Sequence, residues 1–89
     1  MLFPLGQVVA TPGALHALDQ KNMDSRVLLG RHQAGDWGDV PPEDRRENEL
    51  SVNQGFRILS SYPLDDDQRV WIITEADRSV TTILLPDEY

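Results

Sequence analysis

The chain contains no cysteine, a single lysine (Lys21) and no apolar run long enough to cross a membrane. Without cysteine there is no disulfide scaffold, no thiolate metal ligand and no thiol nucleophile. A membrane-spanning helix needs about 18 or more consecutive apolar residues. The first ten residues also lack the basic residues that begin a signal peptide. We therefore expect a cytoplasmic protein.

The length and composition predict one folded domain. Eighty-nine residues provide for a single hydrophobic core, so we treat residues 1–89 as one domain. Hydrophobic residues make up 39% of the chain and charged residues 26%, which is typical of a globular protein and argues against wholesale disorder.

The charge is strongly acidic and unevenly distributed. The net charge is −7, with a sum of +1 over residues 1–35 and of −8 over residues 36–89. Affinity for nucleic acid comes mostly from lysine and arginine neutralising phosphates, so direct nucleic-acid binding is disfavoured. Either the acidity serves solubility, or it matches a protein partner with a basic surface.

Capping residues and apolar spacing predict a strand and a short helix at the start of the chain. Leu5–Ala10 is a brief run of strand type that ends at Thr11. Thr11 suits a helix N-cap, and Pro12 suits the first helical position because its missing N–H is not needed there. The helix is expected to stop near Asn22, a residue that tolerates the left-handed conformation.

Two further helices are expected between Asp24 and Gly55. One is capped by Asp24 and runs to about Ala34. Its inner side is expected to carry Val27, Leu28 and His32. The next begins after Pro41-Pro42 and is ended by Gly55, and its sequence is mostly polar. We expect this third helix to be a solvated outer element that buries little.

After Gly55 the apolar period changes from helical to alternating, which is typical of strands. Three aspartates in a row favour a loop after the first strand, and Ala76–Ser79 is short enough for a tight turn. The strands are expected at Phe56–Tyr62, Arg69–Glu75 and Val80–Leu85.

These elements predict an α+β fold with the order β-α-α-α-β-β-β. The short links of the last three strands indicate an antiparallel meander, with the helices on one face of a small antiparallel sheet. The helices cannot cover both faces, so a homodimer that buries the other face is one hypothesis. We expect that face to carry Trp71, Ile73, Ile83 and Leu85, opposite Val70, Ile72, Val80 and Leu84.

Three segments resemble a family of small single-domain bacterial proteins, found in chromosomes and on mobile elements and described as plasmid-related. The segments are LGQVVATPGAL, RHQAGDWGD and WIITEADRSVTTILLPDEY, at residues 5–15, 31–39 and 71–89. The family has no established activity, so the resemblance implies a bacterial or mobile-element origin and not a reaction. Some members are labelled as a methyltransferase subunit of a restriction enzyme, but this chain has no glycine-rich cofactor loop.

The turn between the last two predicted strands is the first candidate functional site. It carries Glu75, Asp77, Arg78 and Ser79. Two carboxylates and an arginine at a strand end suit phosphate binding, or acid–base work if one carboxylate has a raised pKa. The structural alternative is a turn in which Asp77 bonds the following backbone and Arg78 pairs with Glu75.

The segment around GDWGD is the second candidate, a surface or ligand loop with His32, Asp36, Trp37 and Asp39. Trp37 suits a stacking platform for a ligand, or alternatively a lid on a small core. His32 and Asp36 have the spacing of two metal ligands on a helix, but no third ligand is evident. We therefore expect no metal site and no cofactor.

Two functions from different classes remain open. The first is a non-enzymatic protein-binding module, an acidic inhibitor of a DNA-handling or restriction and defence system. It requires an exposed acidic band of Asp36, Asp39, Glu43, Asp44 and Glu47. The alternative is a small ribonuclease or phosphate-binding enzyme, because the element order resembles that of RelE-type toxins. Fold analogy of this kind is a weak guide to function.

Overall fold

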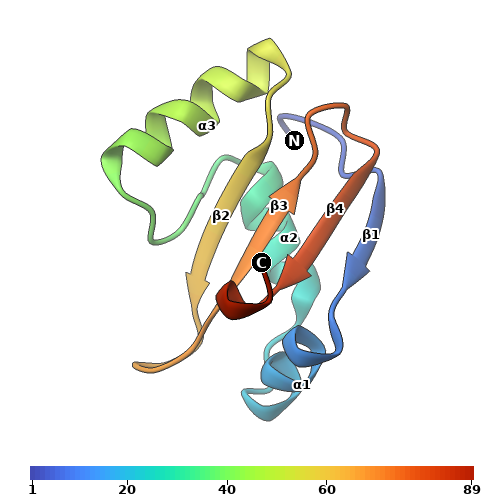
Figure 1. Cartoon of the computed structure of the whole chain (residues 1–89), viewed down its shortest axis with the longest axis vertical. Helices are drawn as coiled ribbons and strands as arrows, with labels where there is room; N and C mark the ends of the chain where they lie inside the picture. Colours follow the sequence, from blue (N-terminus) through green and yellow to red (C-terminus); the bar gives the residue numbers. More distant parts are fainter.

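A computed structural model describes residues 1–89. Its elements follow the predicted order, with bounds within two residues of those expected, and a short 3-10 helix follows the last strand (Figure 1). They are β1 (Gln7–Ala10), α1 (Pro12–Gln20), α2 (Ser25–Gln33), α3 (Pro42–Gln54), β2 (Ile58–Pro63), β3 (Arg69–Thr74), β4 (Val80–Leu84) and the 3-10 helix η1 (Pro86–Glu88). No helix is both long and apolar enough to span a membrane.

The predicted caps set the ends of the first two helices. Thr11 Oγ1 accepts a hydrogen bond of 3.1 Å from the Ala14 N–H at the start of α1. Asn22 has a φ of 52° after that helix, the left-handed conformation expected of it. Asp24 Oδ1 accepts from the Arg26 N–H at 2.9 Å and starts α2. Side chains thus satisfy backbone N–H groups that a helix terminus leaves without a partner.

The sheet is mixed and not purely antiparallel as expected. Its strand order is β1-β4-β3-β2, in which β2, β3 and β4 form the predicted antiparallel meander. β1 instead pairs in parallel with β4. A long connection permits a parallel neighbour, and three helices and two strands separate β1 from β4 along the chain.

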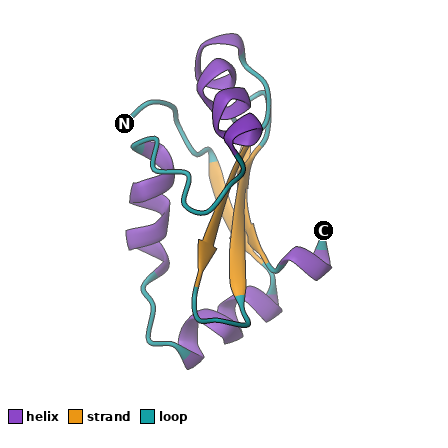
Figure 2. Cartoon of the chain, turned by 90° about the vertical axis from the view of Figure 1, so that its left-hand side faces the viewer, coloured by secondary structure: helices purple, strands orange, loops and turns teal.

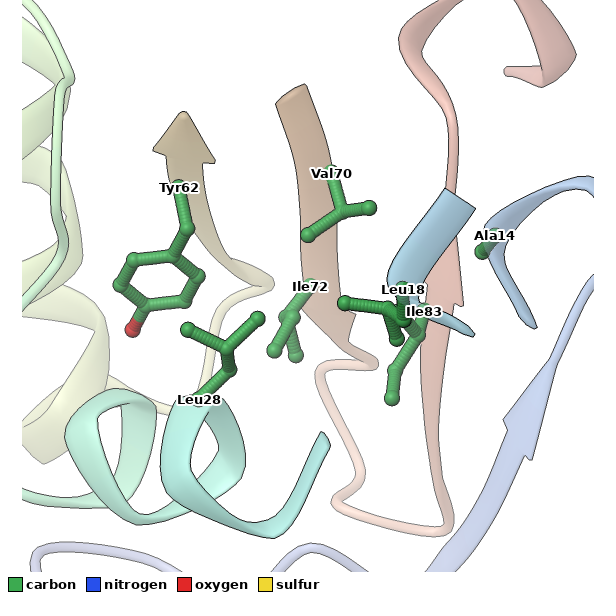
Figure 3. Packing of buried hydrophobic residues seen from close by; sticks show 7 residues of the cluster. All are labelled: Ala14, Leu18, Leu28, Tyr62, Val70, Ile72 and Ile83. Atoms are coloured by element: carbon green, nitrogen blue, oxygen red, sulfur yellow. The ribbon is translucent and has the colours of Figure 1, made fainter. Parts of the chain in front are cut away.

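The helices α1 and α2 cover one face of the sheet and build the main core. Figure 2 shows α2 on one side of the sheet and η1 on the other. Figure 3 shows how the core side chains from the helices and the three meander strands meet: Ala14, Leu18, Leu28, Tyr62, Val70, Ile72 and Ile83. The prediction for the inner side of α2 holds for Leu28 and His32 but is wrong for Val27, which is 56% exposed.

The third helix packs beside β2 and is as solvated as its sequence predicts. Only Asn48 and Ser51 of α3 are buried. A second, smaller core of Phe3, Trp37 and Ile58 lies beneath the N-terminal segment, with Val52 of α3 packed against it. The N-terminal residues and the loop after α2 therefore complete the interior.

The predicted face assignment is wrong for β4. The register pairs Trp71 with Leu84 and Ile72 with Ile83, so each pair shares a face of the sheet. Trp71 and Ile73 therefore share their face with Leu84 and not with Ile83. The predicted alternation of faces within each strand was correct. Which residues of β4 share a face with which residues of β3 depends on the register set by the turn between them, and alternation alone does not determine that register.

Candidate functional site

The predicted turn of Glu75, Asp77, Arg78 and Ser79 is a tightly bonded connection between β3 and β4. Glu75 accepts a hydrogen bond of 3.1 Å from Arg57, across from the start of β2. Asp77 Oδ1 accepts from the Ser79 N–H at 3.0 Å. The hydrogen bonds from Ser79 lower the pKa of the Asp77 carboxyl, so it does not have the raised pKa that acid catalysis requires.

Arg78 faces the protein and does not project as a free cation. Its guanidinium donates to the carbonyl oxygens of Phe56 and Ser51, each at 2.7 Å, and to that of Glu75 at 3.1 Å. It also lies 5.6 Å from the ring centroid of Phe3. One side chain thus ties the end of α3, the approach to β2 and the turn after β3 together. A functional role for this turn stays a prediction.

In the second candidate set, His32 and Trp37 are buried, whereas Asp36 and Asp39 are exposed. His32 is fully buried, with ring nitrogens 2.6 Å from Ser60 Oγ and 2.9 Å from Thr74 Oγ1. Burial, with Arg78 as a smaller cause, lowers the pKa of His32 to about 4. The imidazole is therefore neutral at pH 7 and is held between two hydroxyl groups of the sheet.

The hydrogen bonds of His32 continue through the interior. Thr74 Oγ1 lies 2.7 Å from Thr81 Oγ1, which donates to the Leu5 carbonyl at 2.7 Å. This chain connects α2, three strands of the sheet and the N-terminal segment. Each polar group in it has a partner, as buried polar groups generally must.

Trp37 occupies the interior position that the lid alternative describes. It is 1% exposed and lies 6.3 Å from Phe3, with the rings nearly parallel. Its indole Nε1 is buried without a hydrogen-bond partner. The Trp37 ring is therefore not available on the surface as a stacking platform.

The two aspartates of the loop face solvent and hold arginines. Asp36 Oδ2 accepts from Arg31 Nε at 2.6 Å, and this bond lowers the pKa of the Asp36 carboxyl. Asp39 lies 3.4 Å from Arg69. His32 and Asp36 thus point to different environments despite their spacing. Nowhere in the chain do three or more His, Asp or Glu side chains gather where they could hold a metal.

The sheet face opposite α1 and α2, which we call the open face, is partly buried, because Ile73 and Leu84 on it are only 3% and 6% exposed. Figure 1 is viewed from this side, and only η1 lies in front of the strands. Trp71 is half-buried, and its ring meets the Tyr89 ring edge-on at 5.8 Å. The register places the following residues on this open face: Val9, Leu59, Trp71, Ile73, Val80, Thr82 and Leu84.

A groove lies at one end of this face, between the β2–β3 loop and η1. Its volume is about 420 Å³, and it is lined by Asp67, Gln68, Arg69, Leu85, Pro86 and Asp87. Arg69 on its floor is turned toward Asp39 and Ser61 Oγ. The carboxylates of Asp67 and Asp87 make no ion pair, so the groove presents acceptors for a cation.

The groove was not identified from the sequence. Alternation along β3 places Arg69 and Trp71 on one face, and that signal was available. That Asp67 and Asp87 line the same groove could not be seen in the sequence, because it depends on how η1 folds back toward β3. The sequence had indicated the aspartate run as a solvated loop only.

The acids proposed as an exposed band are all at the surface. Their members are Asp36, Asp39, Glu43, Asp44 and Glu47. Glu43 and Asp44 lie in the first turn of α3, where the helix dipole favours negative charge, and Glu47 follows in the same helix. Comparison of the chain with protein-family models, with curated proteins and with solved structures finds no match.

Proposed function

We propose that the protein is a non-enzymatic module that binds a basic protein surface through the groove and the open sheet face. The observation that carries this proposal is the groove itself. Its lining includes the carboxylates of Asp67 and Asp87, which make no ion pair, and its Arg69 shares a face of β3 with the half-buried Trp71. A lysine or arginine of the partner enters the groove, while an apolar side chain packs on Trp71.

The chemistry of this surface suits protein recognition. Aromatic side chains that keep part of their surface exposed supply large contact area, and tryptophan is enriched among residues that dominate binding energy. Complementary charge adds specificity and speeds encounter. Net charge of −7 directs the whole molecule toward basic surfaces.

The internal bonding of the candidate chemical groups favours a binding role over catalysis. Arg78 bonds three backbone carbonyls, and His32 is buried between two hydroxyls. A ribonuclease or phosphate-binding enzyme needs a cation or a general base that can reach its substrate. In this fold both groups have structural partners instead.

The resemblance to plasmid-related bacterial proteins suggests which partners to consider. A mobile element gains from blocking a host system that handles or cleaves foreign DNA. Such systems hold DNA on basic surfaces, because phosphate binding is mostly electrostatic. We therefore propose an inhibitor of a DNA-handling or restriction system, with carboxylates in place of phosphates.

The test is affinity capture from a bacterial lysate with the wild type and two double variants of equal charge. Asp67→Asn/Asp87→Asn removes the groove carboxylates. Asp19→Asn/Glu49→Gln removes two exposed carboxylates outside both the groove and the acidic band. We expect a stoichiometric partner that the groove variant loses and the control retains, and that Trp71→Ala weakens.

Two results would contradict the proposal. Equal loss of the partner by both double variants would show that capture depends only on the net charge of the protein. Cleavage of RNA by the purified protein would favour the enzymatic alternative. Circular dichroism of each variant must first match that of the wild type.

A further inference from the structure

The two edges of the sheet differ in the hydrogen bonding of their outward backbone groups. The β2 edge is closed, because its outward groups are bonded within the chain. Asn48 of α3 accepts from the Leu59 N–H at 3.1 Å and donates to the Leu59 carbonyl at 2.7 Å. The Ser61 N–H donates to the Trp37 carbonyl at 3.0 Å, and the Asp39 N–H donates to the Ser61 carbonyl at 2.7 Å. The outward backbone groups of Leu59 and Ser61 are therefore satisfied within the chain.

The β1 edge is open. The N–H groups of Gln7 and Thr11 donate to the carbonyls of Ser79 and Ile83, in and next to β4. Backbone groups alternate between the two sides of a strand, so those of Val8 and Ala10 point away from the sheet. No side chain bonds them, and Val8 is 43% exposed. In Figure 1 no element lies beyond β1.

The sequence of β1 is short but carries neither the charges nor the proline that often protect an edge strand. Proteins block such edges with charges, proline, bulges or a covering element. β1 reads Gln-Val-Val-Ala, with no charge and no proline. The same chain seals its other edge with four specific hydrogen bonds and leaves this one without any, so the β1 edge is free for strand pairing.

We infer that two copies of the chain pair through β1 in an antiparallel arrangement about a two-fold axis. In that register Val8 of each copy lies opposite Ala10 of the other. Each of these two Val8–Ala10 pairs then exchanges two backbone hydrogen bonds. Val9 then lies opposite its own counterpart at the axis. Such a contact is self-complementary, as a two-fold interface must be.

The distribution of charge favours this edge for a contact between two acidic molecules. Residues 1–35, which include β1, α1 and α2, carry a sum of +1, whereas the rest carries −8. Contact through β1 keeps the most acidic segments of the two copies apart. Their remaining repulsion is screened by salt, so association strengthens as ionic strength rises.

The pairing is weak and has a consequence for the open face. A four-residue strand buries well under the roughly 1,200 Å² of a standard interface. We therefore expect a dissociation constant for the dimer on the order of 100 µM. Facing residues of antiparallel strands lie on the same side of a sheet, so Val9 and its counterpart continue the open face. Two copies of the groove then face the same direction.

The first experiment is sedimentation equilibrium from about 10 µM to 1 mM, a range that brackets weak association. Val9→Lys places two ammonium groups opposite each other at the axis, and we expect association to weaken at least tenfold. Val27→Lys is the matched control, since Val27 is a 56% exposed valine on α2. It is expected to associate like the wild type.

The second experiment tests the register by charge exchange. Val9→Lys and Val9→Glu are each expected to be monomeric, and their equimolar mixture is expected to form a one-to-one heterodimer. Opposite charges directly across an antiparallel pair are stabilising, whereas like charges are destabilising. In the dimer, the Val8 and Ala10 amides gain protection from hydrogen exchange.

Three outcomes would overturn the inference. They are a wild type that stays monomeric up to 1 mM, a Val9→Lys variant that still dimerises, and a mixture that fails to associate. None of these depends on the groove. A wild type that stays monomeric but captures a partner that Asp67→Asn/Asp87→Asn loses would overturn this inference and leave the proposed function standing.

Discussion

The burial of His32 and Trp37 depends on partners from distant segments of the chain. His32 was expected on the inner side of α2, and burial there follows from helical spacing with Leu28. Its partners were not predictable, because Ser60 and Thr74 come from strands distant in the sequence. Trp37 shows the same limit, since a surface platform and a core lid share one local sequence.

Two glycines predict stability changes of opposite sign. Gly38 has a φ of 75°, and a Cβ there would collide with the Ser61 carbonyl at the sealed β2 edge. We expect Gly38→Ala to lower the free energy of unfolding by at least about 2 kcal/mol. Gly30 lies inside α2, and nothing apart from its chain neighbours and the helix's own backbone lies within 4 Å of its Cβ position, so Gly30→Ala should raise the free energy of unfolding by up to about 1 kcal/mol.

Urea denaturation of both variants, followed by circular dichroism, measures the two changes. Each glycine serves as the control for the other, because the substitution adds the same methyl group. Equal stability of Gly38→Ala and the wild type would contradict the close approach between the loop after α2 and β2.

At the level of elements, local signals predicted nearly everything except pairing between distant segments. Caps and turn residues placed all three helices, and alternation placed the three meander strands. The parallel pairing of β1 with β4 left no local mark, because residues 11–79 intervene. The phase between β3 and β4 failed for a similar reason, since it depends on turn geometry and not on composition.

The seal on the β2 edge gives a prediction for α3. Asn48 is 4% exposed and makes two hydrogen bonds to the Leu59 backbone. We expect Asn48→Ala to lower the free energy of unfolding by about 2 kcal/mol, because both bonds are lost from a buried site. Asn53→Ala, at an exposed position of the same helix, is the control and should change it little.

Loss of the Asn48 seal should also change association. With the Leu59 backbone groups released, the β2 edge becomes a second template for strand pairing. Light scattering at high protein concentration should therefore show larger species for Asn48→Ala than for the wild type. A variant that is less stable but no more associated would show that α3 stabilises β2 without protecting it.

For the whole molecule, length and composition predicted an acidic single-domain chain, and the order of the predicted elements indicated an α+β fold. The α+β fold is confirmed. Length, composition and charge did not indicate where a functional surface lies. The groove arises from three separate segments, the β2–β3 loop, β3 and η1, and its two free carboxylates are 20 residues apart in the sequence. Such a site follows from packing, which composition does not encode.

The stability of the whole molecule should fall between pH 7.5 and pH 5, and His32 is the main cause. Its pKa is about 4 in the folded state and about 6.5 in an unfolded chain, so the unfolded state binds more protons between these values. The stabilising contribution is therefore complete above about pH 6.5 and is lost as the pH falls toward 4. This linkage predicts a loss of about 2 kcal/mol at pH 5.

The exposed carboxylates with lowered pKa values act in a different range. Arg31 lowers the pKa of Asp36, and Ser79 lowers that of Asp77, so these groups lose their contribution only below about pH 4. Denaturant titrations at pH 7.5 and pH 5 therefore isolate His32. His16→Gln, at an exposed position, should keep the pH dependence. His32→Gln should be less stable at pH 7.5 but nearly independent of pH in this window, and a persisting loss would assign the effect to other groups.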